Sequence, residues 1–145
     1  MHIARDHKPK AMIPSFHDGY LKSIAVERGK ATLGLTCVNG EAFELRLDGV
    51  EALQADDFRL GNIISSLEVR GSEPARIDLS ERLERLFPSP HQKAEALYHE
   101  RYSEFIRGVL ARIADGTAAM VIIESSYGCD FVAVCCDIKL TRFGS

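Results

Sequence analysis

Two periodicities divide the apolar positions of this chain. Between residues 94 and 113 apolar residues recur at three- and four-residue steps, which places them on one face of a helix. This stripe consists of Ala94, Leu97, Tyr98, Phe105, Ile106, Val109, Leu110 and Ile113. Almost everywhere else apolar and polar residues alternate, as they do in half-buried strands. The pattern predicts one long amphipathic helix that covers one face of an antiparallel sheet.

Capping residues predict both ends of this helix. Ser89 is the expected N-cap, because Pro90 suits the first helical position and Gln92 completes a capping-box pattern. Gly116 is the expected end, since glycine adopts the left-handed conformation beyond a helix terminus without steric cost. If the apolar face is fully buried, Phe105→Ala should cost about 3–5 kcal/mol of stability.

Three strands in sequence predict a meander in the first third of the chain. The strands are expected over residues 20–28, residues 30–38 and the segment that carries Phe43, Leu45 and Leu47. A tight turn at Gly29-Lys30 joins the first two strands. Asn39-Gly40 is a strong signal for the second hairpin, because a type I′ turn needs positive φ at both central residues.

A long strand is expected over residues 58–70, and its phase slips at Gly61-Asn62. Phe58 and Leu60 share one parity, whereas Ile63, Leu67 and Val69 share the other. A β-bulge at Gly61 would return the apolar side chains to the core. Further on, Ser80 followed by Leu83 and Leu86 predicts one or two helical turns before Pro88.

A second hairpin is predicted around Tyr127-Gly128, with strands over residues 117–126 and 130–141. Met120 to Ile123 are apolar at successive positions, which indicates a central strand covered on both faces. The fold prediction is therefore a single α+β domain over residues 15–145, preceded by a flexible segment, residues 1–14. Its antiparallel sheet would have six or seven strands, be twisted or partly closed, and be covered by the one long helix.

Composition and charge exclude several classes of protein. A hydrophobic content of 46% with 27% charged residues is too apolar for general disorder. The net charge of −3, with lysines and arginines scattered, gives no reason to expect a nucleic-acid partner. No apolar stretch approaches the ~20 residues that cross a bilayer, and the N-terminus has no signal-peptide core. We therefore expect a cytoplasmic protein without membrane contact.

The four cysteines are expected to be buried core residues rather than metal ligands or nucleophiles. Cys135 and Cys136 are neighbours on a strand and so face opposite ways, while Cys129 and Cys135 would lie about 20 Å apart at strand rise. Zinc needs four converging ligands, usually in closely spaced pairs. Cys37 lies in an apolar strand register. No metal and no cofactor are predicted.

His17-Asp18 is the most suggestive local pair. A carboxylate beside an imidazole can tune a general base or seat a metal. Adjacent residues of an extended segment point to opposite sides, however, so the pair is not expected to act on one ligand. The alternative interpretation is that Asp18 closes a turn while His17 packs at the sheet edge.

Four further residues are candidates for a ligand or partner site. Asn62, next to Gly61 within a strand, marks either a close backbone approach to a ligand or a bulge. Glu124 and Tyr127 can line a pocket mouth at the second hairpin, or simply belong to a polar turn. Asp57 is a carboxylate that could serve His17. The sequence has no Gly-x-Ser-x-Gly elbow, Walker phosphate loop or His-Glu-x-x-His motif.

Two short motifs carry a resemblance to a known family. The Phe16-His17-Asp18-Gly19 opening and the Asp-Phe-Arg-Leu-Gly-Asn-Ile-Ile segment from Asp57 to Ile64 resemble small bacterial proteins. Some of these are similar to the immunity-protein-50 type of contact-dependent toxin systems. The resemblance covers about the first half of the chain. It implies an α+β protein that binds and neutralises a partner toxin without catalysis, and it carries over no catalytic residues.

Two hypotheses for function follow from the sequence. The first is a non-enzymatic binding module for an unknown protein partner, with a homodimer through a sheet edge as one form of it. The second is a small-ligand-binding or hydrolytic enzyme that uses His17 with Asp18, Asp57 or Glu124. The enzyme hypothesis requires His17 and a distant carboxylate on one wall of a pocket.

Overall fold

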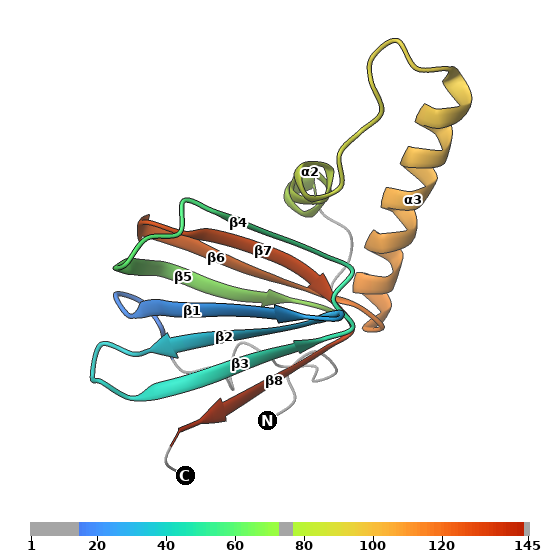
Figure 1. Cartoon of the computed structure of the whole chain (residues 1–145). Helices are drawn as coiled ribbons and strands as arrows, with labels where there is room; N and C mark the ends of the chain where they lie inside the picture. Colours follow the sequence, from blue (N-terminus) through green and yellow to red (C-terminus); the bar gives the residue numbers. More distant parts are fainter. Residues whose placement is uncertain (1–14, 73–76, 144–145) are drawn as a thin grey trace.

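A computed structural model describes residues 15–72 and 77–143, so the flexible segment predicted for residues 1–14 lies outside the described ranges. The described elements are β1 (Tyr20–Glu27), β2 (Lys30–Thr36), β3 (Ala42–Asp48), β4 (Ala52–Asp56), β5 (Asn62–Arg70), α2 (Ile77–Leu86), α3 (Ala96–Asp115), β6 (Ala119–Tyr127), β7 (Asp130–Cys135) and β8 (Asp137–Arg142). The strands form one antiparallel sheet in the order β4-β7-β6-β5-β1-β2-β3-β8 (Figure 1). This confirms the α+β class, although within the described residues the sheet has eight strands and two helices accompany it.

The predicted meander is confirmed, but the turn type of its second hairpin is not. Arg28 and Gly29 both have positive φ, at 40° and 75°, and form the tight first turn. In the second hairpin Gly40 has a φ of 91° whereas Asn39 does not have positive φ, so the turn is not type I′. The reason is local: Asn39 Oδ1 accepts a hydrogen bond from the Glu41 backbone N–H at 2.9 Å, which supports a longer loop.

Two very short connections bend the sheet strongly. β3 and β8 lie together at one edge and β4 and β7 at the other, yet residues 49–51 alone join β3 to β4 and Cys136 alone joins β7 to β8. The two edges must therefore approach each other at this end, towards which the strands converge in Figure 1. The Cys136 N–H donates to the Asp48 carbonyl at 2.9 Å. The single strand predicted over 130–141 is wrong, because the chain changes strand partners at Cys136.

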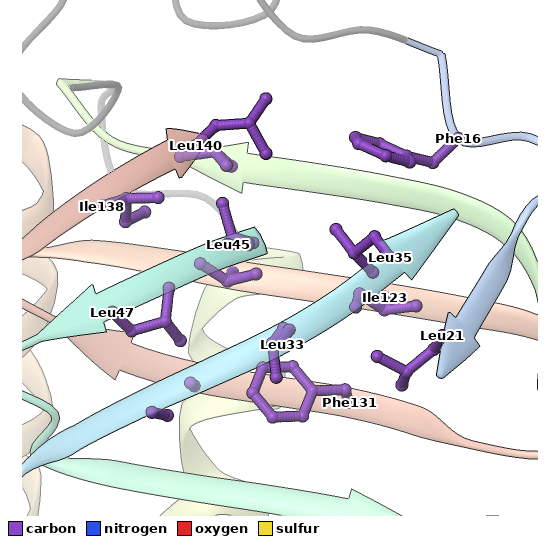
Figure 2. Packing of buried hydrophobic residues seen from close by; sticks show 14 of the residues in the cluster. Phe16, Leu21, Leu33, Leu35, Leu45, Leu47, Ile123, Phe131, Ile138 and Leu140 are labelled. Atoms are coloured by element: carbon purple, nitrogen blue, oxygen red, sulfur yellow. The ribbon is translucent and has the colours of Figure 1, made fainter. Parts of the chain in front are cut away.

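Bending creates an inner core between the two halves of the sheet. Side chains from β2, β3 and β8 point towards those of β6 and β7 (Figure 2). A second core lies between the outer face of β6 and β7 and the two helices. Val121 and Ile123 of β6 belong to the first core, and Met120 and Ile122 to the second. The prediction that this strand is covered on both faces is confirmed.

The long helix is shorter than predicted and begins differently. α3 starts after Glu95, which makes no side-chain capping hydrogen bond, so Ser89 is not the N-cap. Instead, a side chain of the helix fixes the loop that precedes it: the Tyr102 hydroxyl donates a hydrogen bond to the Phe87 carbonyl at 2.7 Å. The predicted end is confirmed: Gly116 has a φ of 84°, and its N–H donates to backbone carbonyls of the last helical turn.

α3 packs on the rest of the protein from Tyr102 onwards, and its first turns do not contribute to the core. Ile106, Val109 and Ile113 are buried, whereas Leu97 and Phe105 remain 48% and 47% exposed. The short helix predicted before Pro88 is α2, and it contributes Leu79 and Leu83 to the outer core. The predicted stripe is therefore only partly a packing face, and full burial of Phe105 is wrong. Of the helices in the described ranges, none is long and apolar enough to cross a membrane.

The bulge predicted at Gly61 is also wrong. β5 begins at Asn62, and residues 57–61 form the loop between β4 and β5. The register irregularity lies further along, between Ile63 and Ser66, where β5 pairs with β6. Phe58 and Leu60 differ in parity from the strand because they do not belong to it. The residue that ends the loop, Asn62, fixes its shape, as described below.

Candidate functional site

Several chain reversals meet at one end of the sheet, at the left in Figure 1. β1 begins there, with Tyr20 opposite Ile63 of β5, and Ile63 in turn lies opposite Tyr127 of β6. The β4–β5 loop and the β6–β7 hairpin are therefore neighbours. Three of the six residues singled out in the sequence, Asp57, Asn62 and Tyr127, come together here.

Asn62 is the structural centre of this end. Its side chain is 1% exposed, and Nδ2 donates to the carbonyls of Leu21 at 3.1 Å and Arg59 at 2.7 Å. Oδ1 accepts from the backbone N–H groups of Arg59 at 2.8 Å and Cys129 at 3.0 Å. These four bonds use the full capacity of an amide side chain. Asn62 thus ties the β4–β5 loop to β1 and to the β6–β7 hairpin.

Gly128 is required for this arrangement. A Cβ at position 128 would lie 2.3 Å from Asn62 Oδ1, and the backbone φ of 87° is left-handed. Glycine therefore permits both the hairpin turn and the close approach of Asn62.

The loop fixed by Asn62, together with Tyr20 of β1 and Tyr127 of β6, exposes apolar and aromatic side chains. We call the set Tyr20, Phe58, Arg59, Leu60 and Tyr127 the loop surface. Leu60 is fully exposed, at 108% of its reference area, and the three aromatic side chains are between 43% and 50% exposed. Because Tyr20 and Tyr127 both lie opposite Ile63, they share one face of the sheet.

Arg59 is braced within the loop surface. Its guanidinium carbon lies 5.8 Å from the centre of the Tyr127 ring, within range of a cation–π contact. Arg59 Nε and Nη2 lie 3.0 and 2.9 Å from Asp57 Oδ1, and Asp57 itself has a φ of 62°. The hydrogen bond and charge of Asp57, followed by Tyr127, raise the pKa of Arg59 above its ordinary value. The guanidinium is therefore charged under all physiological conditions.

Carboxylates gather beside the loop surface around the Cys129 thiol. Burial raises the pKa of Cys129 to about 11, and the negative charges of Asp130, Asp56 and Asp57 add to the effect. Burial also raises the pKa of Cys135 to about 12. Both thiols are protonated at neutral pH and are poor nucleophiles. Within residues 15–72 and 77–143, no group of three or more His, Cys, Asp or Glu side chains is arranged to hold a metal ion.

Glu124 lies apart from the loop surface, in a groove of about 490 Å³ between α2 and the outer face of β4, β7 and β6. Its Oε1 accepts a hydrogen bond from Arg82 Nη2 at 2.6 Å. The charged residues that line the groove are Asp56, Asp78, Glu81, Arg82, Arg85, Glu124 and Asp130. Carboxylates outnumber guanidinium groups there, so the groove is acidic.

His17 and Asp18 form a third, separate group. His17 Nδ1 lies 2.8 Å from the Ser65 carbonyl oxygen and Nε2 lies 3.5 Å from Asp18 Oδ2. The expectation that the two side chains point apart is wrong, because Asp18 has a φ of 62° and the segment is not extended. In the described part of the chain, Asp18 is the one carboxylate within ion-pair distance of His17. The other two candidate carboxylates have different partners: Asp57 pairs with Arg59, and Glu124 pairs with Arg82.

Sequence reasoning missed Phe58, Arg59 and Leu60, which it placed in a strand. The signal was present as the phase slip: apolar residues out of step with a strand are candidates for exposed loop residues. Comparison of the chain with protein-family models, curated proteins and solved structures finds no match.

Proposed function

We propose that this protein is a non-enzymatic binding module that engages a protein partner through the loop surface. The observation that carries the proposal is a rigid loop that exposes large apolar and aromatic side chains. Leu60 and Phe58 contribute little to the two cores, since they are 108% and 47% exposed. Tyrosine, phenylalanine and arginine are the residue types that dominate the centres of protein interfaces.

Rigidity supports a binding role for this loop in particular. Ordering side chains and loops on association reduces affinity, and a loop already held in one conformation avoids that cost. The backbone of Arg59 is fixed on both its N–H and its carbonyl by Asn62, and the Arg59 side chain is fixed by Asp57 and Tyr127. A partner would therefore meet a preformed surface.

An immunity-type role is one form of this proposal. The Asp57–Ile64 segment, on which the resemblance partly depends, contains the β4–β5 loop. Neutralising a toxin by binding needs a preformed complementary surface and no catalytic group. The preformed loop surface supports this role, and a second copy of the chain is the other protein partner that the same test would detect.

Site-specific photocrosslinking tests the proposal. p-Benzoylphenylalanine incorporated at Leu60, which is fully exposed, should give one discrete adduct in the organism that encodes the protein. The matched control is the same substitution at Val26, an apolar residue that is 61% exposed near the opposite end of β1. The Leu60 adduct should disappear on addition of Phe58→Asp. No adduct at Leu60, or the same adducts from both positions, would refute a binding role for this surface.

The alternative, an enzyme that uses His17, rests on the His17–Asp18 contact at 3.5 Å. This pair can supply one general base, because the Nδ1 contact with the Ser65 carbonyl orients the ring. Of the distant carboxylates that the hypothesis names, Asp57 pairs with Arg59 and Glu124 with Arg82. His17→Ala would abolish any turnover found in a substrate screen under this alternative, and it would leave the Leu60 adduct unchanged under the binding proposal.

A further inference from the structure

A row of carboxylates leads from the loop surface into the groove beneath α2. Asp57 belongs to the β4–β5 loop, and Asp56 is the last residue of β4. Asp130 on β7 lies directly opposite Asp56 in the strand register, and both residues line the groove. Like charges directly opposite each other on neighbouring strands are destabilising. The protein therefore keeps an unfavourable arrangement at this position.

Neutral donors, rather than cations, satisfy the two opposed carboxylates. Asp130 Oδ1 accepts from the Ser125 N–H at 2.9 Å and the Ser125 hydroxyl at 3.0 Å. Asp56 Oδ1 accepts from Gln54 Nε2 at 3.3 Å. In the part of the chain that the structure describes, no lysine, arginine or histidine lies within ion-pair distance of either residue. Of the neighbouring guanidinium groups, Arg59 is paired with Asp57 and Arg82 with Glu124, while Arg85 also lines the groove.

We infer that the protein partner carries a cationic segment whose lysine or arginine side chains lie along Asp56 and Asp130 and enter the groove. This inference rests on the proposed function and names the partner's chemistry. Continuity favours a protein segment: Asp56, Asp57 and Phe58 are consecutive, so a partner seated on the loop surface would lie close to the carboxylate row. Cationic side chains would make charge-assisted hydrogen bonds there and would be steered towards the surface during encounter.

The first test uses a basic peptide as a probe. Capped trilysine titrated into the full-length protein at low salt should shift the backbone NMR signals of residues 54–57 and 125–130 before those of other acidic regions. Asp56→Asn with Asp130→Asn should abolish these shifts, since asparagine keeps the hydrogen-bond acceptors but removes the charges. Shifts spread evenly over all acidic residues would overturn the inference. Equally tight binding of spermidine, which carries the same charge as trilysine, would also overturn the inference and would indicate a small polycation as the ligand.

The second test separates this inference from the proposed function. In the Leu60 crosslinking experiment the Asp56→Asn, Asp130→Asn pair should lower the adduct yield at least about fivefold at low salt, because electrostatic steering changes association rates by roughly tenfold or more. The matched control, Glu27→Gln with Glu100→Gln, changes the net charge equally at exposed positions elsewhere and should change the yield less than about twofold. An unchanged yield in the aspartate pair refutes the cationic segment while the binding module stands. If the protein without these aspartate substitutions gives no adduct at Leu60, the binding module itself is refuted.

Discussion

Replacing Asn62 by alanine should destabilise the protein and release the β4–β5 loop. The substitution removes all four hydrogen bonds of the amide. Two of the partners, the Leu21 carbonyl and the Cys129 N–H, belong to residues that are 1% exposed, so water cannot easily replace the lost bonds. A buried polar group without its partner costs about 1–3 kcal/mol. The backbone N–H and carbonyl of Arg59 lie on an exposed loop and should add little to the loss of stability.

The expected loss for Asn62→Ala is therefore about 2–5 kcal/mol, measured by urea unfolding followed by circular dichroism. Asn39→Ala is the matched control, because Asn39 is exposed and makes a single hydrogen bond with Glu41; it should cost less than about 1 kcal/mol. Hydrogen exchange of the Arg59 amide should accelerate only in the Asn62 variant. An unfolding midpoint equal to that of the unmodified protein would refute the view that Asn62 holds the loop.

Gly128→Ala offers an independent check on the same contact. The new Cβ would meet Asn62 Oδ1 at 2.3 Å and would occupy a left-handed backbone, so it should also destabilise the protein. Adding Asn62→Ala removes the atom that clashes. The double variant should consequently be more stable than the sum of the two single effects predicts, and strict additivity would show that the two residues do not interact.

Three further predictions concern the rest of the molecule. The folded-state pKa is about 11 for Cys129 and about 12 for Cys135, against an ordinary value of 9.0. Because the unfolded chain loses these protons at lower pH than the folded protein, the free energy of unfolding should fall as pH rises above about 9. Both thiols should also resist iodoacetamide in the native protein at neutral pH. Ile113→Ala, at a residue with 0% exposure, should cost about 2–5 kcal/mol, whereas Phe105→Ala at 47% exposure should cost only about 1–2 kcal/mol; equal thermal shifts would contradict the partial packing of α3. Asp56→Asn should raise stability by about 0.2–1 kcal/mol by relieving the like-charge pair across β4 and β7, and a lower unfolding midpoint would contradict this.

Local patterns predicted those parts of the fold that local forces determine. The alternation of Leu33, Leu35, Leu45 and Leu47 identified both strands of a hairpin, because each strand buries one face against the same core. Gly116 ended the helix as expected, since the left-handed cap is a property of the backbone itself. These features would form in much the same way in many different folds.

Long-range contacts decided the features that the sequence did not reveal. Nothing near Cys136 signals that β8 leaves β7 to pair with β3, because the alternation continues through the switch. The helix began late because Tyr102 holds Phe87, a contact between residues on either side of the loop. The capping pattern at Ser89 was overridden by this tertiary packing.

Only some residues of the candidate site were predictable, and their grouping was not. Asp57, Asn62 and Tyr127 were singled out for separate reasons, and only the antiparallel register of β5 and β6 brings them together. Asn62 proved to be an internal support, with its polar atoms turned towards the protein. Its importance could not be read from the chain, because two of its partners, Leu21 and Cys129, come from distant segments.

The placement of β8 beside β3 has a consequence for how the chain folds. β1, β2 and β3 are joined by short connections and can assemble from local contacts alone, whereas β3 acquires its second neighbour only from the far end of the described chain. Closing such a long loop is entropically unfavourable and slows folding. Until β8 arrives, the open edge of β3 is a template for pairing with other chains. Aggregation during refolding should thus compete with this one late step, and conditions that accelerate docking of β8 should suppress it.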